Sequence, residues 1–148
     1  MPYALACALA ALAGGGLTAQ IGLNVQLRQS LGHPVLAAFV SFSVGALILG
    51  LVALAMRAPL PAGQAIAGAP AWAWFGGFLG AGYVLATIMI GPKLGAGLFV
   101  VLVIAGQLTA ALLIDQLGLL GGAAQPISAA RALGAALALA GVWLVQRG

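Results

Sequence analysis

The chain has 148 residues, of which 64% are hydrophobic and 4% are charged, and its mean hydropathy is +1.22. A soluble domain carries about 25% charged residues, so this composition excludes a soluble protein and predicts a single membrane domain over residues 1–148. The single cysteine, Cys7, excludes internal disulfides and a multi-cysteine metal site. The net charge of +4 comes from scattered basic residues without a cluster, so we expect no nucleic-acid partner.

The N-terminal sequence MPYALACALAALAGGG has the small residues of a signal peptide, but no basic region precedes them. Its apolar run continues past Ala19, so we expect a retained membrane span. A helix needs about 20 apolar residues to cross a hydrocarbon core of about 30 Å, and about five segments meet this length. The predicted spans are Tyr3–Leu27, Val35–Met56, Trp72–Gly91, Gly95–Leu117 and Ala129–Gln146.

Charge and helix-breaking residues separate the spans. The breaks read RQSLGHP at 28–34, RAPLPAGQAIAGAP at 57–70, GPK at 91–93 and GLLGGAAQP at 118–126. Each break contains a proline, which suits the start or the end of a helix. The second break is the longest, and its length leaves room for a short interfacial helix. The segments are too long and too uniformly apolar for barrel strands, so the predicted fold class is an all-α integral membrane bundle.

The basic residues are almost evenly divided between the two ends of the predicted bundle. With five spans, Arg57 and Arg131 lie on the side of the N-terminus, while Arg28, Lys93 and Arg147 lie on the other side. Orientation in a membrane follows the asymmetry of Lys and Arg between loops, and here almost none exists. This balance predicts insertion in both directions and an antiparallel, dual-topology homodimer with inverted-repeat symmetry.

Several polar side chains interrupt the apolar spans. Gln20 and Asn24 lie four residues apart and therefore share one face of the first helix. Such groups either bond between helices in a dry interface or face a polar cavity that water can enter. We take the second alternative as the functional hypothesis. It assigns substrate binding to Gln20, Asn24, Ser41, Tyr83 and Gln107, with Gln107 near the middle of the membrane.

Glycines recur inside the spans at small-xxx-small spacing. Such faces let two helices approach closely, either within one chain or between subunits. The predicted packing positions are Gly45, Gly76, Gly80, Gly106 and Gly134.

The chain has one acidic residue, Asp115, near the end of the fourth predicted span. We expect an interfacial charge there, paired with Arg131 or with a backbone group, and not a buried acid that couples transport to protons. The sequence contains no Ser/His/Asp set, no metal-ligand cluster and no phosphate-binding loop after a strand. It therefore predicts neither an enzyme nor a metal or cofactor site.

Four stretches carry a family resemblance over nearly the whole chain: LNVQLRQSLGHPVLAAFVSFSVG, GGFLGAGYV, PKLGAG…AGQLTAALLIDQLG and PISAARALGAALALAGVWL. Their order resembles the small YdcZ-type family of the drug/metabolite transporter superfamily. The resemblance implies five-span subunits, some of which form antiparallel homodimers and others paired or fused halves, and it implies transport in a bacterial inner membrane. The matching positions are Asn24, Ser41, Phe42, Gly45, Gly77, Gly80, Pro92, Gly106, Gln107, Asp115 and Arg131. The chain has no glutamate, so the glutamate-dependent antiport of the superfamily's four-span exporters does not carry over.

Three functional hypotheses follow. The first is a secondary transporter of a small organic solute, working by alternating access in an antiparallel homodimer surrounded by lipid. The second is a dual-topology small-ion channel, because GGFLGAGY at 76–83 resembles a glycine motif of fluoride channels, although it lacks their arginine. The third is a membrane assembly subunit without transport activity, in which the buried amides only join helices. Non-saturating flux would favour the second hypothesis, and an obligate partner on purification would favour the third.

Overall fold

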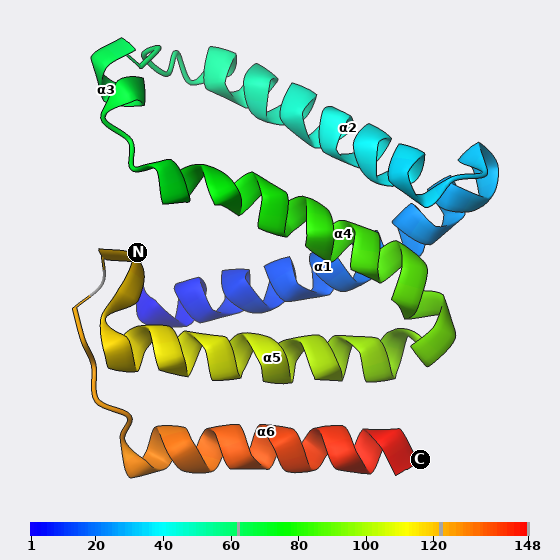
Figure 1. Ribbon diagram of the computed structural model, residues 1–148, viewed down its shortest axis with the longest axis vertical. Helices are drawn as coiled ribbons and strands as arrows, with labels where there is room; N and C mark the ends of the chain where they lie inside the picture. Colours follow the sequence, from blue (N-terminus) through cyan, green and yellow to red (C-terminus); the bar gives the residue numbers. More distant parts are fainter. Residues whose placement is uncertain (62, 122, 148) are drawn as a thin grey trace. The chain divides into compact units, whose positions relative to one another are not determined.

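A computed structural model describes residues 1–61, 63–121 and 123–147 (Figure 1). Within these residues, five helices are long and apolar enough to cross a membrane, which confirms the predicted all-helical class and helix number. They are α1 (Tyr3–Leu31), α2 (Pro34–Ala55), α4 (Phe75–Leu94) with the 3₁₀ turn η1 (Ala71–Trp74) before it, α5 (Ala96–Leu117) and α6 (Ala129–Arg147). A short helix, α3 (Gly63–Ala67), lies in the long second loop, and the 3₁₀ turn η2 (Leu119–Gly121) follows α5.

The chain divides into two compact units, Met1–Pro92 and Lys93–Gly148. The first unit holds α1, α2, α3, η1 and almost all of α4. The second holds α5, η2 and α6. Each unit is described by itself below.

A glycine ends α1 and a capped proline begins α2. Gly32 has the left-handed φ of +73°, and its N–H donates to the carbonyl of Arg28 at 2.8 Å. His33 then caps α2 by accepting a hydrogen bond from the N–H of Val35 on its Nδ1 at 3.3 Å, and Pro34 occupies the first helical position. The left-handed Gly32 therefore ends α1, and the charged Arg28 does not. The helix extends four residues beyond the predicted span, which ended at Leu27.

The prediction that the chain breaks at residues 91–93 is wrong, because these residues lie inside α4. The helix continues through Pro92 to Leu94, and the chain breaks at Gly95, where φ is +79°. A proline close to the end of a helix removes a single hydrogen bond and leaves the preceding turns intact. Glycine is the residue that adopts positive φ without strain, so it marks the break more reliably than the proline does.

The core of the first unit joins α2 to α4. Ala37 and Ala38 of α2 pack with Val84 and Ile88 of α4, and both Ala37 and Ile88 are completely buried. Leu27, Tyr83 and Leu85 pack against this cluster. The small alanine side chains leave room in this cluster for the larger side chains of α4.

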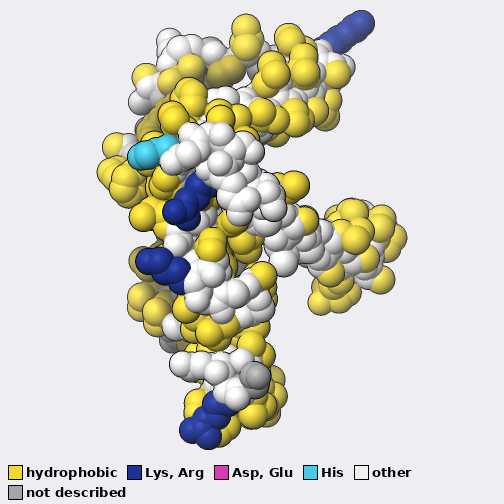
Figure 2. All heavy atoms as spheres, turned by 90° about the vertical axis from the view of Figure 1, so that its right-hand side faces the viewer, with side chains coloured by type: hydrophobic (Ala, Val, Ile, Leu, Met, Phe, Trp, Pro, Cys, Tyr) yellow, Lys and Arg dark blue, Asp and Glu magenta, His cyan; other side chains and the backbone are white. Residues whose placement is uncertain are grey.

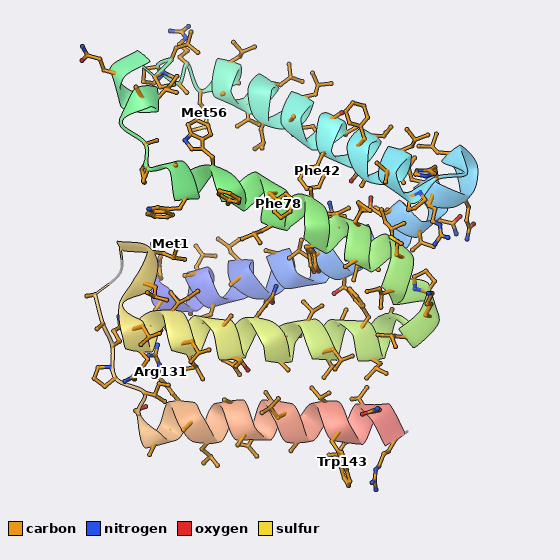
Figure 3. The ribbon with its side chains drawn as sticks, viewed as in Figure 1. Met1, Phe42, Met56, Phe78, Arg131 and Trp143 are labelled. Carbon is orange, nitrogen blue, oxygen red and sulfur yellow. The ribbon has the colours of Figure 1, made fainter. Side chains whose placement is uncertain are left out.

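Two glycines of α4 are approached by side chains of neighbouring helices in the same unit. A Cβ at Gly80 would lie 3.6 Å from Cζ of Phe42, which points from α2 toward α4 (Figure 3). A Cβ at Gly91 would lie 3.5 Å from Cγ2 of Ile21 on α1. These contacts place both α1 and α2 against the same helix.

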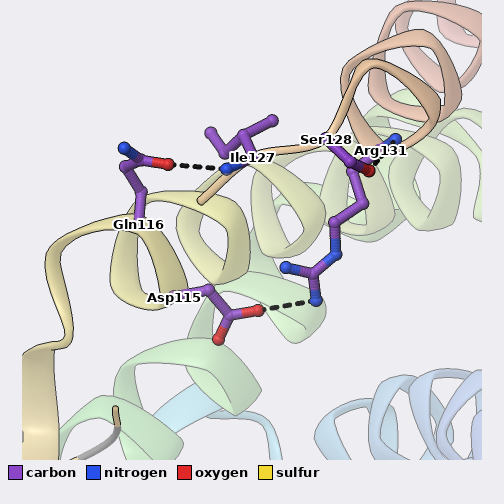
Figure 4. A network of polar contacts seen from close by, with 5 residues as sticks. All are labelled: Asp115, Gln116, Ile127, Ser128 and Arg131. Atoms are coloured by element: carbon purple, nitrogen blue, oxygen red, sulfur yellow. Dashed lines mark hydrogen bonds and ion pairs between the residues drawn. The ribbon is translucent and has the colours of Figure 1, made fainter. Parts of the chain in front are cut away.

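In the second unit, α5 packs against α6 and the loop between them is held by hydrogen bonds. Gly118 ends α5 with a left-handed φ of +59°, and a Cβ at this position would lie 3.0 Å from the backbone nitrogen of Ala124. Gln116 accepts a hydrogen bond from the N–H of Ile127 on its Oε1 at 2.7 Å, and the Ser128 hydroxyl accepts one from Arg131 N–H at 3.3 Å (Figure 4). Both bonds fix the start of α6.

The outer surfaces of the helices are apolar. Most of the large hydrophobic side chains are exposed, and α6 has no buried residue within the described part of the chain. Figure 2 shows hydrophobic side chains over much of the face in view, with basic side chains at a few places. Trp72 and Trp143 are about half exposed near helix ends, where tryptophan favours the membrane interface. Lipid is the solvent that such surfaces require.

Candidate functional site

A groove between α1 and α2 brings together three of the predicted binding residues. Gln20, Asn24 and Ser41 line this groove, which has a volume of 510 Å³. Its other walls are apolar and come from Leu23, Leu27, Val40, Val44, Gly45 and Ile48. An adjoining hollow of 300 Å³ shares Gln20, Ser41 and Gly45 with it. Neither lining includes a charged side chain.

The local structure explains why these side chains meet. Residues four apart on a helix lie on the same face, so Gln20 and Asn24 project from one side of α1. The tight connection at Gly32 and His33 turns the chain back, and α2 packs on α1. Ser41, about two turns into α2, then comes level with the pair on α1.

The polar residues of the groove differ from other polar residues of the helices in their hydrogen bonding. The hydroxyl groups of Thr18, Ser43, Thr87 and Thr109 each donate to a carbonyl three or four residues earlier on the same helix, at 2.7–3.2 Å. In the described part of the chain, the side chains of Gln20, Asn24 and Ser41 make no such bond. Their donors and acceptors are free for a ligand or for water.

Asn24 is the most informative member of this group. The residue is only 4% exposed, and its side chain makes no hydrogen bond within the described residues. Every fully buried side-chain nitrogen or oxygen in these residues has a hydrogen-bond partner, so the amide atoms of Asn24 are not fully buried. Its amide atoms must therefore be reachable from the groove. An amide left in a dry apolar site would cost several kcal/mol, so an accessible groove explains how the residue is accommodated.

The other two predicted binding residues lie outside this lining. Tyr83 is half-buried on α4, where it packs against the Ala37–Ile88 cluster. Gln107 is exposed on α5 in the second unit. Its predicted place in a cavity shared with Gln20 and Asn24 stays a prediction.

The binding residues were predicted from their polarity, so the prediction did not include the apolar residues that line the groove. Leu23 and Leu27 follow Gln20 at helical spacing on α1, and Val44 and Ile48 follow Ser41 on α2. Residues at i+3, i+4 and i+7 from a polar position lie on the same helix face, so this spacing could have identified the apolar residues from the sequence.

The five glycines predicted to serve helix packing differ in their surroundings. Gly80 is in contact with Phe42, whereas a Cβ at Gly45, Gly76, Gly106 or Gly134 would meet nothing within 4 Å. Gly45 lines the groove, so its missing side chain leaves room there. For the other three glycines, close packing against a second subunit stays a prediction. The approach of Ile21 to Gly91 was not predicted, because Gly91 was assigned to the break at residues 91–93 and not to a packed helix face.

Asp115 and Arg131 form an ion pair at the loop end of the α5–α6 hairpin. Nη2 of Arg131 lies 2.9 Å from Oδ2 of Asp115, and the two side chains are 41% and 38% exposed (Figure 4). The carbonyl of Asp115 also accepts a hydrogen bond from the N–H of Gln125 at 2.7 Å. An ion pair this exposed contributes about 0–1 kcal/mol, so its main effect is to orient the loop.

The described residues offer no arrangement for metal binding. No group of three or more His, Cys, Asp or Glu side chains in this part of the chain could hold a metal ion. The groove instead presents neutral donors and acceptors beside apolar walls, an arrangement suited to binding a small organic molecule.

Comparison with protein families identifies the chain. A family model described as "Putative inner membrane exporter, YdcZ" matches residues 5–144. The chain belongs to the YdcZ family. The match confirms the resemblance seen in the sequence motifs, and it includes every residue of the α1–α2 groove. No curated protein and no solved structure matches the chain.

Membership of the YdcZ family, together with five helices able to span a membrane, makes the chain a multi-pass inner-membrane protein. An exporter family also indicates transport of some solute and points away from an enzyme.

Proposed function

We propose that this YdcZ-family protein is a secondary transporter of a small organic solute, and that the α1–α2 groove forms part of its binding site. One observation carries the proposal. Gln20, Asn24 and Ser41 face a common groove with unpaired hydrogen-bonding groups, whereas the threonines and Ser43 are satisfied by their own helices.

The chemistry of the groove favours a neutral or weakly cationic solute. A side-chain amide both donates and accepts hydrogen bonds and carries no charge. It suits hydroxyl, amide or carbonyl groups better than a strong anion or a bare metal ion. The volume of 510 Å³ lies within the range of about 300–1,000 Å³ that is usual for small-molecule sites. The apolar walls would hold the hydrocarbon part of the solute.

The transport mechanism that we propose uses two copies of the chain. Nearly equal numbers of basic residues on the two sides support insertion in both directions. An antiparallel homodimer would supply a second groove and the inverted repeat on which alternating access depends in many transporters. The exposed apolar helix faces offer surface for this association.

Ligand-induced stabilisation tests the proposed site. Purified protein in detergent would be heated with a panel of hydroxyl- and amide-bearing metabolites and drug-like amines. A solute that binds the folded state at 100 times its Kd stabilises it by about 2.7 kcal/mol, which raises the melting temperature. We expect Asn24→Leu to abolish this shift, because leucine has a similar size but no hydrogen-bonding group.

Ser43→Ala is the matched control for Asn24→Leu. The Ser43 hydroxyl already bonds to the carbonyl of Phe39 at 2.9 Å, so its loss leaves the groove unchanged and the shift should persist. A thermal shift of normal size in folded Asn24→Leu would contradict the assignment of this groove.

A further inference from the structure

Arg28 links α1 to α4 through a backbone carbonyl. Its Nη1 donates a hydrogen bond to the carbonyl oxygen of Ile88 at 3.0 Å, across 60 positions of sequence. In an uninterrupted α-helix, that carbonyl would accept a bond from the N–H of residue 92. Residue 92 is proline, which has no N–H. The guanidinium of Arg28 therefore occupies the position of the missing helix donor.

The surroundings of this bond make it costly to lose. Ile88 is completely buried, and an unsatisfied buried carbonyl is strongly unfavourable. Ile21 approaches Gly91 on the same stretch of α4, and Leu27 packs against the cluster that contains Ile88. Apolar contacts thus hold α1 against α4, and Arg28 adds a directional polar bond to them.

Among the residues that the structure describes, no acidic side chain competes for Arg28. The only acidic residue of the chain, Asp115, is paired with Arg131 at 2.9 Å in the second unit. The Ile88 carbonyl is the only hydrogen-bond partner of the Arg28 guanidinium among the residues that the structure describes.

Arg28 also shares a helix face with the groove. Gln20, Asn24 and Arg28 follow one another at intervals of four residues, so they lie on the same side of α1. A bond that fixes Arg28 against α4 limits the rotation and sliding of this whole face. Asn24 is the nearest of these side chains, one turn away.

We propose that Arg28 is a positioning residue for the α1–α2 groove, and that it acts through the Ile88 carbonyl left free by Pro92. The functional part of this inference rests on the proposed solute site. The Arg28–Pro92 relationship itself does not, because it concerns how α1 is anchored. The competing explanation is that Arg28 is an ordinary interfacial charge, whose loss would have the same effect whatever residue stands at position 92.

A double-mutant cycle separates these two explanations. Pro92→Ala restores a backbone N–H at residue 92, which can satisfy the Ile88 carbonyl within α4. We expect Arg28→Gln alone to lower the melting temperature by about 5 °C, and the same change in a Pro92→Ala background to cost less than half as much. Arg28→Lys keeps the charge and carries its donor further along the side chain than glutamine does, so it should recover part of the loss. Arg57→Gln is the charge-matched control and should have the same small effect in both backgrounds.

The position of the groove is measured separately, by thiol labelling. Ser41→Cys in a Cys7→Ser background places one thiol in the groove, and N-ethylmaleimide measures its accessibility without any solute. We expect Arg28→Gln to change the labelling rate at least threefold, and Arg57→Gln to leave it unchanged. Arg28→Lys should give a rate nearer that of the parent, and it also serves if Arg28→Gln does not fold.

Equal effects of Arg28→Gln in both backgrounds would overturn the anchoring role. An unchanged labelling rate in destabilised Arg28→Gln would overturn the positioning role. Neither result depends on transport. Failure of the proposed solute site would appear instead as normal solute binding by Asn24→Leu.

Discussion

At the scale of single residues, a polar side chain inside a span is informative about function when its hydrogen-bonding groups have no partner in the chain. Thr109 and Gln107 lie two positions apart on α5, but the Thr109 hydroxyl donates to the carbonyl of Ala105 at 2.8 Å. Asn24 makes no comparable bond although it is 4% exposed. A satisfied hydroxyl contributes to the helix that contains it, whereas an unsatisfied amide remains available for recognition.

This distinction predicts different results for two neighbouring substitutions on α5. Gln107→Leu should leave a folded protein with at least tenfold weaker solute binding, because it removes a free donor and acceptor. Thr109→Val should change affinity by less than threefold, because that hydroxyl is already engaged. Binding titrations on both purified variants provide the comparison. Normal affinity in Gln107→Leu, or unfolding without any specific loss of binding, would show that Gln107 takes no part in solute binding.

At the scale of helices, the groove depends on one position without a side chain. Gly45 lines the groove on α2, and a Cβ built there meets nothing within 4 Å. The space belongs to the groove and not to a helix–helix contact. The protein can therefore fold with a larger side chain at position 45, but that side chain takes up volume that a solute needs.

We accordingly expect Gly45→Leu to fold and to lose solute binding. Replacing glycine within a helix also gains about 1 kcal/mol of helix propensity, so the melting temperature should be equal or higher. Gly22→Leu is the matched control, since Gly22 is also helical, has equally open space and lies outside the groove lining. Retained binding in Gly45→Leu would show that the solute does not occupy this part of the groove.

The helices and the placement of Gln20 and Asn24 on one helix face were predictable because simple periodic rules govern them. Lipid demands about 20 apolar residues per span, and i, i+4 spacing places Gln20 beside Asn24. Helix ends were harder, because Pro92 lies within α4 while Gly95 breaks it. The hydrogen bond of Arg28 had no sequence signal, since its acceptor is a carbonyl 60 positions away. Small-xxx-small spacing likewise indicates that a helix face can be approached, but not which helix approaches it.

At the scale of the whole molecule, the distribution of charge governs orientation. Five basic residues divide almost equally between the two predicted sides of the membrane, and the one acid is paired. Because Lys and Arg set the orientation of a membrane chain, this balance leaves neither direction strongly favoured. Both orientations in one membrane are what an antiparallel homodimer requires.

Thiol labelling from each side of the membrane measures the orientation. Gln64→Cys in a Cys7→Ser background places one exposed thiol on α3 in the second loop. We expect an impermeant maleimide to label roughly half of the molecules in intact cells and the remainder only after permeabilisation. Two lysines added to that loop should shift the ratio strongly toward one side. Complete labelling from a single side would exclude the antiparallel homodimer.

The central claim is that the α1–α2 groove binds the solute that the protein carries across the membrane. Solute counterflow into proteoliposomes tests it most directly, using a solute that raises the melting temperature of the parent protein. The account predicts saturable counterflow by the parent and by Ser43→Ala, and a loss of at least tenfold in kcat/KM with folded Asn24→Leu. Non-saturating flux in the parent, or counterflow of normal kcat/KM in Asn24→Leu, would contradict it.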